Sequence, residues 1–188
     1  GNYVVAPASA EYGNKAVMVN GSYIANGIAE TKFKLINNYP SPLFYFRYNG
    51  SSGGYAAKLS NSGSSNIFTL YIYKVAPDGS LTDYIGTQAI YNNLDYSQWH
   101  TFRVECSGSS IKAYIDGYSS NYAKATDSTY SSGSLGYGTN YGCYFDDLET
   151  SQGITKVDDF ALWAMTPVSG QWKVSDDGTG NVAYAQTR

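Results

Sequence analysis

The chain has 188 residues, which is enough for one domain with a two-layer core. It contains 20 tyrosines and 20 glycines, only 14% of its residues are charged, and its formal net charge is -3. A basic surface that could neutralise phosphates is absent, so we expect no nucleic-acid partner. No apolar run approaches the length that spans a membrane, so we expect no membrane insertion either.

Alternating apolar and polar residues predict short strands separated by polar turns along most of the chain. No stretch of ten or more residues keeps the periodicity of an amphipathic helix. The expected strands cover 3–5, 16–19, 27–35, 43–48, 55–59, 67–75, 82–89, 135–139, 143–149 and 157–165. The segment 119–134 is expected to be a loop. This pattern predicts an all-β fold, a two-sheet antiparallel β-sandwich.

The strongest local signal is the segment 99–117, with the sequence WHTFRVECSGSSIKAYIDG. Apolar residues alternate with polar ones over 102–106, and again over 111–115 after a Ser/Gly turn. That pattern predicts a hairpin of two strands. Trp99 and Trp163 lie in apolar strand patterns, so both are expected in the core.

Several motifs of this hairpin resemble the concanavalin A-like (laminin-G-like) superfamily of jelly-roll lectins and glucanases. The resemblance rests on Trp-x-x-Phe-Arg-Val, a glycine turn and Ile-Lys-Ala-Tyr-Ile-Asp-Gly. In that superfamily a Gly-x-Leu-Gly strand and a Phe-Asp-Asp strand follow, and this chain has them at 133–136 and 145–147. The resemblance covers about 17–160 and implies a jelly roll similar to carbohydrate-binding modules.

The end of the chain has an unusual place in this order. We divide the chain into a jelly-roll sandwich at 1–166 and a linker with terminal strands at 167–188. In the superfamily that it resembles, a Trp-x-Val strand, an Asp-Gly turn and a Tyr-x-Gln strand open the domain, whereas here they close it. Circular permutation, excision from a tandem array and strand donation to a neighbouring subunit all stay open. The residues expected to anchor these strands, in either sandwich, are Trp172, Val174 and Tyr184.

The sequence predicts no catalytic residue. Glycosidases use two carboxylates that flank one bond, and no such pattern at alternate strand positions occurs here. His100 is the only histidine, and we interpret it as a structural residue at a strand end. Jelly-roll polysaccharide lyases use Tyr, His and Arg, so Tyr45, Arg47 and His100 keep a lyase or glycosidase as a third alternative.

Two Asp-Asp-apolar motifs are candidates for holding a structural calcium ion. In β-sandwich carbohydrate-binding modules, which these motifs resemble, one such aspartate often helps to hold Ca²⁺. Asp146 and Asp158 are the corresponding candidate metal ligands. The alternative is that these carboxylates cap turns, because Ca²⁺ needs six to eight oxygen ligands.

Cys106 and Cys143 are the only cysteines. They are either two buried small apolar residues or one disulfide between the hairpin and the Phe-Asp-Asp strand. The composition is typical of secreted proteins, which favours the disulfide.

The expected sugar site lies on one face of the sandwich. If Phe44 and Phe46 face the core, the strand alternation turns Tyr45 and Arg47 outward; the same argument turns Tyr71 and Tyr73 outward from 67–75. Aromatic rings and polar groups on one face suit binding of a glycan. The alternative is that the row of tyrosines follows from the composition alone.

We therefore expect an extracellular (secreted or cell-surface), non-catalytic module that binds a poly- or oligosaccharide. The second hypothesis is a structural subunit of an extracellular filament or array, assembled from copies of this chain by donation of the C-terminal strand.

Overall fold

The computed structural model describes residues 4–6, 15–36, 39, 41–61, 66–117, 120–140, 143–151, 165–167, 174–176 and 182–184. Every regular element in this part of the chain is a β-strand. No helix among these residues is long and apolar enough to cross a membrane.

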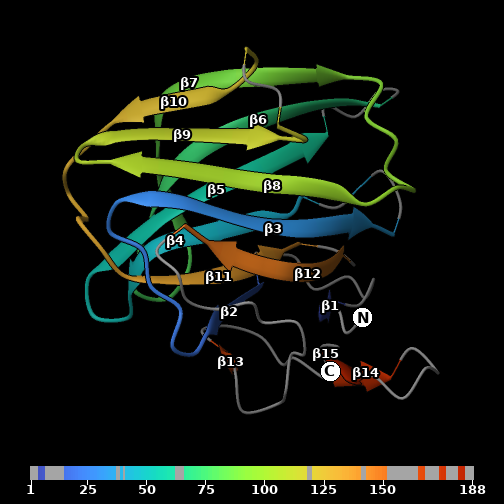
Figure 1. The fold of residues 1–188 in the computed structure, drawn as a ribbon, viewed down its shortest axis with the longest axis horizontal. Helices are drawn as coiled ribbons and strands as arrows, with labels where there is room; N and C mark the ends of the chain where they lie inside the picture. Colours follow the sequence, from blue (N-terminus) through green and yellow to red (C-terminus); the bar gives the residue numbers. More distant parts are fainter. Residues whose placement is uncertain are drawn as a thin grey trace.

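Thirteen strands form one antiparallel sheet that curls over into two packed layers (Figure 1). The front layer contains, in spatial order, β1 (Val4–Ala6), β12 (Cys143–Thr150), β3 (Gly27–Leu35), β8 (His100–Ser107), β9 (Ser110–Ile115) and β10 (Ala123–Thr126). The back layer contains β6 (Ile67–Val75), β5 (Gly53–Asn61), β4 (Leu43–Asn49), β11 (Ser134–Thr139), β2 (Lys15–Val19) and β13 (Met165–Pro167). The fold is therefore the predicted all-β jelly-roll sandwich.

One long strand, β7 (Leu81–Asn92), joins the layers, because it pairs with β6 on one side and β10 on the other. A bulge interrupts the β6–β7 pairing, and Gly86 lies within it with a φ of +81°. A Cβ at this position would lie 1.9 Å from the carbonyl oxygen of Lys124. Glycine is thus required where β7 approaches β10 so closely.

The strand pattern of the sequence is confirmed for most of the sheet. The strands at 27–35 and 67–75 begin and end where the alternation predicted. β10 is the exception, because it lies inside the segment 119–134 that was predicted to be a loop. Its Ala-Lys-Ala-Thr sequence contains few strong strand formers, although Ala123 and Ala125 are buried as in any half-buried strand.

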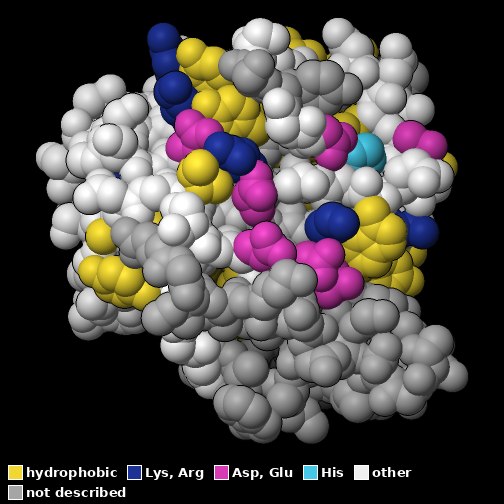
Figure 2. Space-filling view, in the orientation of Figure 1, with side chains coloured by type: hydrophobic (Ala, Val, Ile, Leu, Met, Phe, Trp, Pro, Cys, Tyr) yellow, Lys and Arg dark blue, Asp and Glu magenta, His cyan; other side chains and the backbone are white. Residues whose placement is uncertain are grey.

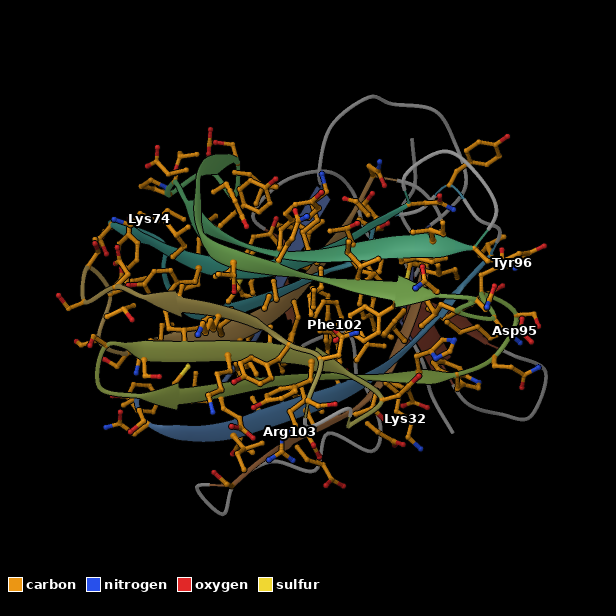
Figure 3. All side chains as sticks on the ribbon, turned by 90° about the horizontal axis from the view of Figure 1, so that it is seen from above. Lys32, Lys74, Asp95, Tyr96, Phe102 and Arg103 are labelled. Carbon is orange, nitrogen blue, oxygen red and sulfur yellow. The ribbon has the colours of Figure 1, made fainter. Side chains whose placement is uncertain are left out.

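Aromatic side chains fill the space between the layers. The rings of Tyr137 and Phe145 stack at 4.6 Å, and Phe44 contacts both Tyr137 and Phe102 from the back layer. Figure 3 shows Phe102 between the two layers. The prediction that Trp99 belongs to this core is wrong, because its side chain is 40% exposed and lies near Tyr144.

The outer face of the front layer is charged. Arg103 forms ion pairs with Glu30 at 2.8 Å and with Glu105 at 2.6 Å. Figure 2 shows acidic and basic side chains side by side across the middle of this face. The charge of Arg103 is therefore already paired with two carboxylates of the same face.

The cysteines do not form the predicted disulfide, and both are buried and free. Cys106 is opposite Gly27 and Cys143 is opposite Leu35, at the two ends of β3. Eight residues of strand separate these ends by about 26 Å, whereas a disulfide needs Cα atoms within about 7 Å. The structure corresponds to the alternative of two buried small apolar residues.

The terminal strands pair with each other. β14 (Val174–Asp176) and β15 (Val182–Tyr184) form a two-stranded antiparallel sheet in which Val174 is opposite Tyr184. Both strands contact β1 of the same chain. Trp172, Trp163 and most of the strand expected at 157–165 lie outside the described residues. Donation of the tail to another subunit stays a prediction.

Candidate functional site

Three tyrosines form a cluster on the outer face of the back layer. Tyr71 and Tyr73 lie on β6, and Tyr84 is opposite Tyr73 on β7. Their ring centroids are 5.4 to 6.1 Å apart, so each ring contacts the other two. Tyr84 is 45% exposed and the other two are half-buried. We call Tyr71, Tyr73 and Tyr84 the tyrosine cluster.

The alternation of β6 explains why these rings point away from the core. Phe68, Leu70 and Ile72 are fully buried between the layers, so Tyr71 and Tyr73 project from the opposite face. The sequence predicted this outward orientation, and the structure confirms it for both tyrosines.

Burial favours the protonated form of two hydroxyl groups of the cluster, those of Tyr73 and Tyr84. It raises the pKa of Tyr73, and the neighbouring Tyr71 and Tyr84 raise it further. Burial also raises the pKa of Tyr84, with a smaller contribution from Tyr71. Each of these hydroxyls can therefore donate as well as accept a hydrogen bond at neutral pH.

Lys58 lies beside the cluster on the same face. It is directly opposite Tyr71 in the β5–β6 register, and the next residue on that face, Ala56, is opposite Tyr73. The lysine side chain is half-buried. The face thus combines three aromatic rings with one cationic group.

Tyr45 and Arg47 do not join this surface, so their prediction as exposed ligand-binding residues is wrong. Tyr45 does lie on the outer face, opposite Ala56, but its side chain is fully buried. The turn between β6 and β7 covers it, and its hydroxyl donates a hydrogen bond of 3.0 Å to the carbonyl of Gly79. Tyr48 beside it similarly donates to the carbonyl of Pro77.

Arg47 turns to the interior because β4 has a bulge there. The residue has a φ of 49°, and the β4–β5 register shifts between Phe46 and Asn49. This shift reverses the alternation, so Arg47 is 1% exposed while Tyr48 takes the outward position. The Arg47 guanidinium then donates to backbone carbonyls from three different loops.

These bonds hold one end of the sandwich together. Nε donates to the carbonyl of Ala25 at 2.8 Å, and Nη1 donates to those of Gly108 at 3.0 Å and Tyr130 at 3.2 Å. Arg47 is therefore a structural residue and not a ligand-binding one.

A polar cleft of about 490 Å³ opens at the opposite end of the sandwich. It is lined by Ile90, Tyr91, Asn92, Asn93, Leu94, Asp95, His100, Asp116 and Asn121. Asp95 marks this end in Figure 3, while Lys74 marks the other. The cleft is formed by loops and strand ends, which sequence alternation does not bring together.

His100 is one of the residues that line this cleft. Its Nδ1 lies 2.6 Å from Asp116 Oδ2, and its Nε2 lies 2.7 Å from the carbonyl oxygen of Asp95. Both ring nitrogens are thus occupied by protein groups. Because His100 begins β8 and Arg47 contacts Gly108 beyond its other end, these two residues are far apart. The Tyr45, Arg47 and His100 set considered for a lyase is therefore not brought together.

Asp146 lies half-buried on β12, where burial raises the pKa of its carboxyl to about 6. The carboxylate accepts a hydrogen bond of 2.9 Å from the backbone N–H of Asp147. Among the described residues, no three His, Cys, Asp or Glu side chains gather closely enough to hold a metal ion. Asp158 lies outside these residues, so a calcium site that joins it to Asp146 stays a prediction.

Sequence reasoning missed two residues of the candidate site, Tyr84 and Lys58. Both lie on strands that were predicted, but their positions beside Tyr71 and Tyr73 depend on which strands are neighbours. The alternation of a strand gives its faces and not its partners.

The sequence matches no protein-family model and no curated protein sequence. The fold is similar to that of carbohydrate-binding module CBM66 from Bacillus subtilis, with a TM-score of 0.59 and 14% identity, covering 78% of this chain and 93% of that one. A protein of unknown function with a galectin-like fold from Bacillus subtilis matches with a TM-score of 0.52 and 12% identity, covering 75% of this chain and 79% of that one. A single mutant of congerin II has a TM-score of 0.52 and 8% identity, with 73% and 99% covered. The chain thus has the jelly-roll fold that lectins and carbohydrate-binding modules use.

Proposed function

We propose that the protein is a non-catalytic carbohydrate-binding module that holds a saccharide against the tyrosine cluster. The observation that carries this proposal is the mutual contact of three rings on an outer sheet face, with Tyr84 45% exposed. An aromatic patch that stays partly exposed on a sheet face is a candidate binding surface. A ligand that covers it would remove apolar area from water, which favours binding.

The chemistry of the cluster suits a sugar. A tyrosine ring offers an apolar face to the C–H groups of a pyranose, and its hydroxyl can hydrogen-bond to the sugar hydroxyls. The backbone under the cluster is held in place by pairing of β6 with β5 and β7 before a ligand arrives. A preorganised surface loses less conformational entropy on binding.

The similar solved structures support this proposal at the level of fold, since one is named as a carbohydrate-binding module and another as galectin-like. Folds host many functions, so the site carries the argument. An extracellular location, secreted or at a cell surface, is part of the same proposal and rests on the low charge and the abundance of Tyr and Gly.

The test compares two tyrosine substitutions of the same type on different layers. Tyr84→Ala removes the exposed ring of the cluster. Tyr122→Ala removes a ring on the front layer that packs against Tyr114 at 5.3 Å. Wild type and both variants are screened on a glycan array, and hits are measured by affinity electrophoresis in the matching polysaccharide.

We expect Tyr84→Ala to weaken binding about fivefold, because one aromatic contact contributes about 1 kcal/mol. Tyr122→Ala should bind like the wild type. Equal binding by all three proteins would mean that the cluster is not the site, and the absence of any glycan ligand for the wild type would refute the function.

A further inference from the structure

Lys58 is the only cation beside the tyrosine cluster among the described residues of this face. On β5 it lies between Leu43 of β4 and Tyr71 of β6, each of which is its direct partner in the register. Its neighbours across the strands are thus one apolar and one aromatic side chain. Ala56 and Ser60 precede and follow it on the same face of β5.

Within the described part of the chain, Lys58 belongs to no ion pair. The lysines and arginine that do form such pairs are Lys32 with Asp147, Lys74 with Asp127, and Arg103 with Glu30 and Glu105. Half-burying a lysine without a carboxylate is unfavourable, because the ammonium loses water and gains no counter-charge.

The titration behaviour of two lysines on adjacent strands agrees with this contrast. Burial lowers the pKa of Lys58, and no neighbouring charge opposes the effect. The pKa of Lys74 is raised, chiefly by its hydrogen bond to Asp127. A bound anion would stabilise the charged form of Lys58 in the way that Asp127 stabilises that of Lys74.

We propose that the saccharide held on the tyrosine cluster is acidic, with a carboxylate or sulfate group placed against Lys58. This inference rests on the proposed function and specifies the ligand class for the same surface. The rings provide contact area that any pyranose can use. Lys58 makes the site bind acidic polysaccharides more tightly than neutral ones.

The experiment uses matched polysaccharides in affinity electrophoresis. Polygalacturonate and alginate carry carboxylates, and each is compared with its carboxyl-reduced form. Heparin and chondroitin sulfate, which carry sulfate groups, are compared with their desulfated forms. Every pair is run at 50 mM and at 300 mM NaCl with the wild type, Tyr84→Ala, Lys58→Met and Lys58→Arg.

We expect at least one acidic polymer to bind the wild type ten or more times tighter than its neutralised form, with weaker binding at 300 mM NaCl. Lys58→Met should lose this preference, while Lys58→Arg should keep most of it. The matched control is Lys112→Met, which removes a lysine that lies over the Tyr122 ring on the front layer and should change nothing. Thermal unfolding of each variant is measured to check that the substitution leaves the fold intact.

The outcomes separate the two proposals. If the wild type binds neutralised polymers as well as acidic ones and Tyr84→Ala still loses binding, the acidic ligand is wrong and the carbohydrate function stands. A preference for acidic polymers that survives in Lys58→Met also refutes the role of Lys58. If none of these polymers binds, the acidic ligand is wrong, and the glycan array alone decides the carbohydrate function. If Tyr84→Ala binds like the wild type, both proposals fail.

Discussion

His100 and Asp116 form a charge-assisted pair at the rim of the polar cleft, with Nδ1 and Oδ2 2.6 Å apart. The other oxygen of Asp116 accepts a hydrogen bond of 2.8 Å from the backbone N–H of Thr101. On the other side of the ring, Nε2 can donate to the carbonyl of Asp95. Since both partners of the imidazole are acceptors, its doubly protonated form satisfies this geometry best.

The first prediction is a pH dependence of stability. Burial alone would lower the pKa of His100, but its hydrogen bonds to Asp116 and to the Asp95 carbonyl outweigh burial and raise it. A raised pKa in the folded state means that the stabilisation is complete below pH 6.5 and is lost as the pH rises through the folded value. The difference in unfolding free energy between wild type and His100→Asn should therefore shrink as the pH rises from 6 to about 8.5.

Urea denaturation at several pH values measures this difference, and an NMR titration of the single histidine gives its pKa directly. A pKa of His100 below 6.5 in the folded protein would contradict the prediction.

Asp146 gives a second electrostatic prediction. Burial raises its pKa from 3.8 to about 6, so the folded state resists the charged form. The stability linked to this group is present below pH 3.8 and lost as the pH rises through 6. At pH 8, Asp146→Asn should raise the unfolding free energy by about 1 kcal/mol, less than the shift alone implies because water screens this half-buried group.

Asp147→Asn is the matched control. Asp147 lies next in the chain and forms a 3.5 Å ion pair with Lys32, with both side chains about half exposed. Its removal should change the unfolding free energy by less than about 0.5 kcal/mol. Equal effects of the two substitutions in urea denaturation would show that burial does not distinguish these carboxylates.

Arg47 gives the largest expected loss of stability. Arg47→Met removes hydrogen bonds to the carbonyls of Ala25, Gly108 and Tyr130 and leaves them without this donor. We expect a loss of about 3 kcal/mol in urea denaturation. Arg47→Lys should not restore the wild-type value, because an ammonium cannot reproduce the planar set of donors.

Arg103→Met tests whether the effect belongs to burial, since Arg103 also makes several hydrogen bonds but lies on the exposed charged face. We expect a loss of at most about 1 kcal/mol. If Arg103→Met lowered the unfolding free energy as much as Arg47→Met, the large effect at Arg47 could not be attributed to its burial.

The last prediction concerns the thiols. Cys106 and Cys143 lie at opposite ends of β3 and are free. Burial raises the pKa of Cys106 to about 11, so its thiol should be unreactive in the folded protein. Thiol titration should find two groups after denaturation without reductant, and dithiothreitol should leave the melting temperature unchanged. An intact mass lower by two hydrogens would contradict this.

The sequence predicts the strands and their faces better than it predicts the site. The alternation in 67–75 is regular, so the outward direction of Tyr71 and Tyr73 followed from it. At Arg47 the same argument failed, because one residue with a left-handed backbone shifts the alternation and no residue type marks it. Tyr45 was assigned to the correct face, but a turn distant in the chain covers it.

Residues that act together across strands could not be found from periodicity. Tyr84 joins the cluster through a register that bulges on both sides of Ile72 and Tyr73. The disulfide prediction was wrong for a related reason. The number of cysteines does not give the distance between them, which depends on where each one lies along β3.

The position of β7 in both layers has a consequence for how molecules of this protein can meet. Because β7 pairs with β6 and with β10, the described sheet is continuous over that side and ends only at β1 and β13. Both ends lie at the bottom of the view in Figure 1. A strand from another chain can extend this sheet only at a free edge, so growth of any β-linked polymer would be confined to one side of the molecule. The tyrosine cluster, on the face of strands near the closed side, would stay accessible to ligand in such a polymer.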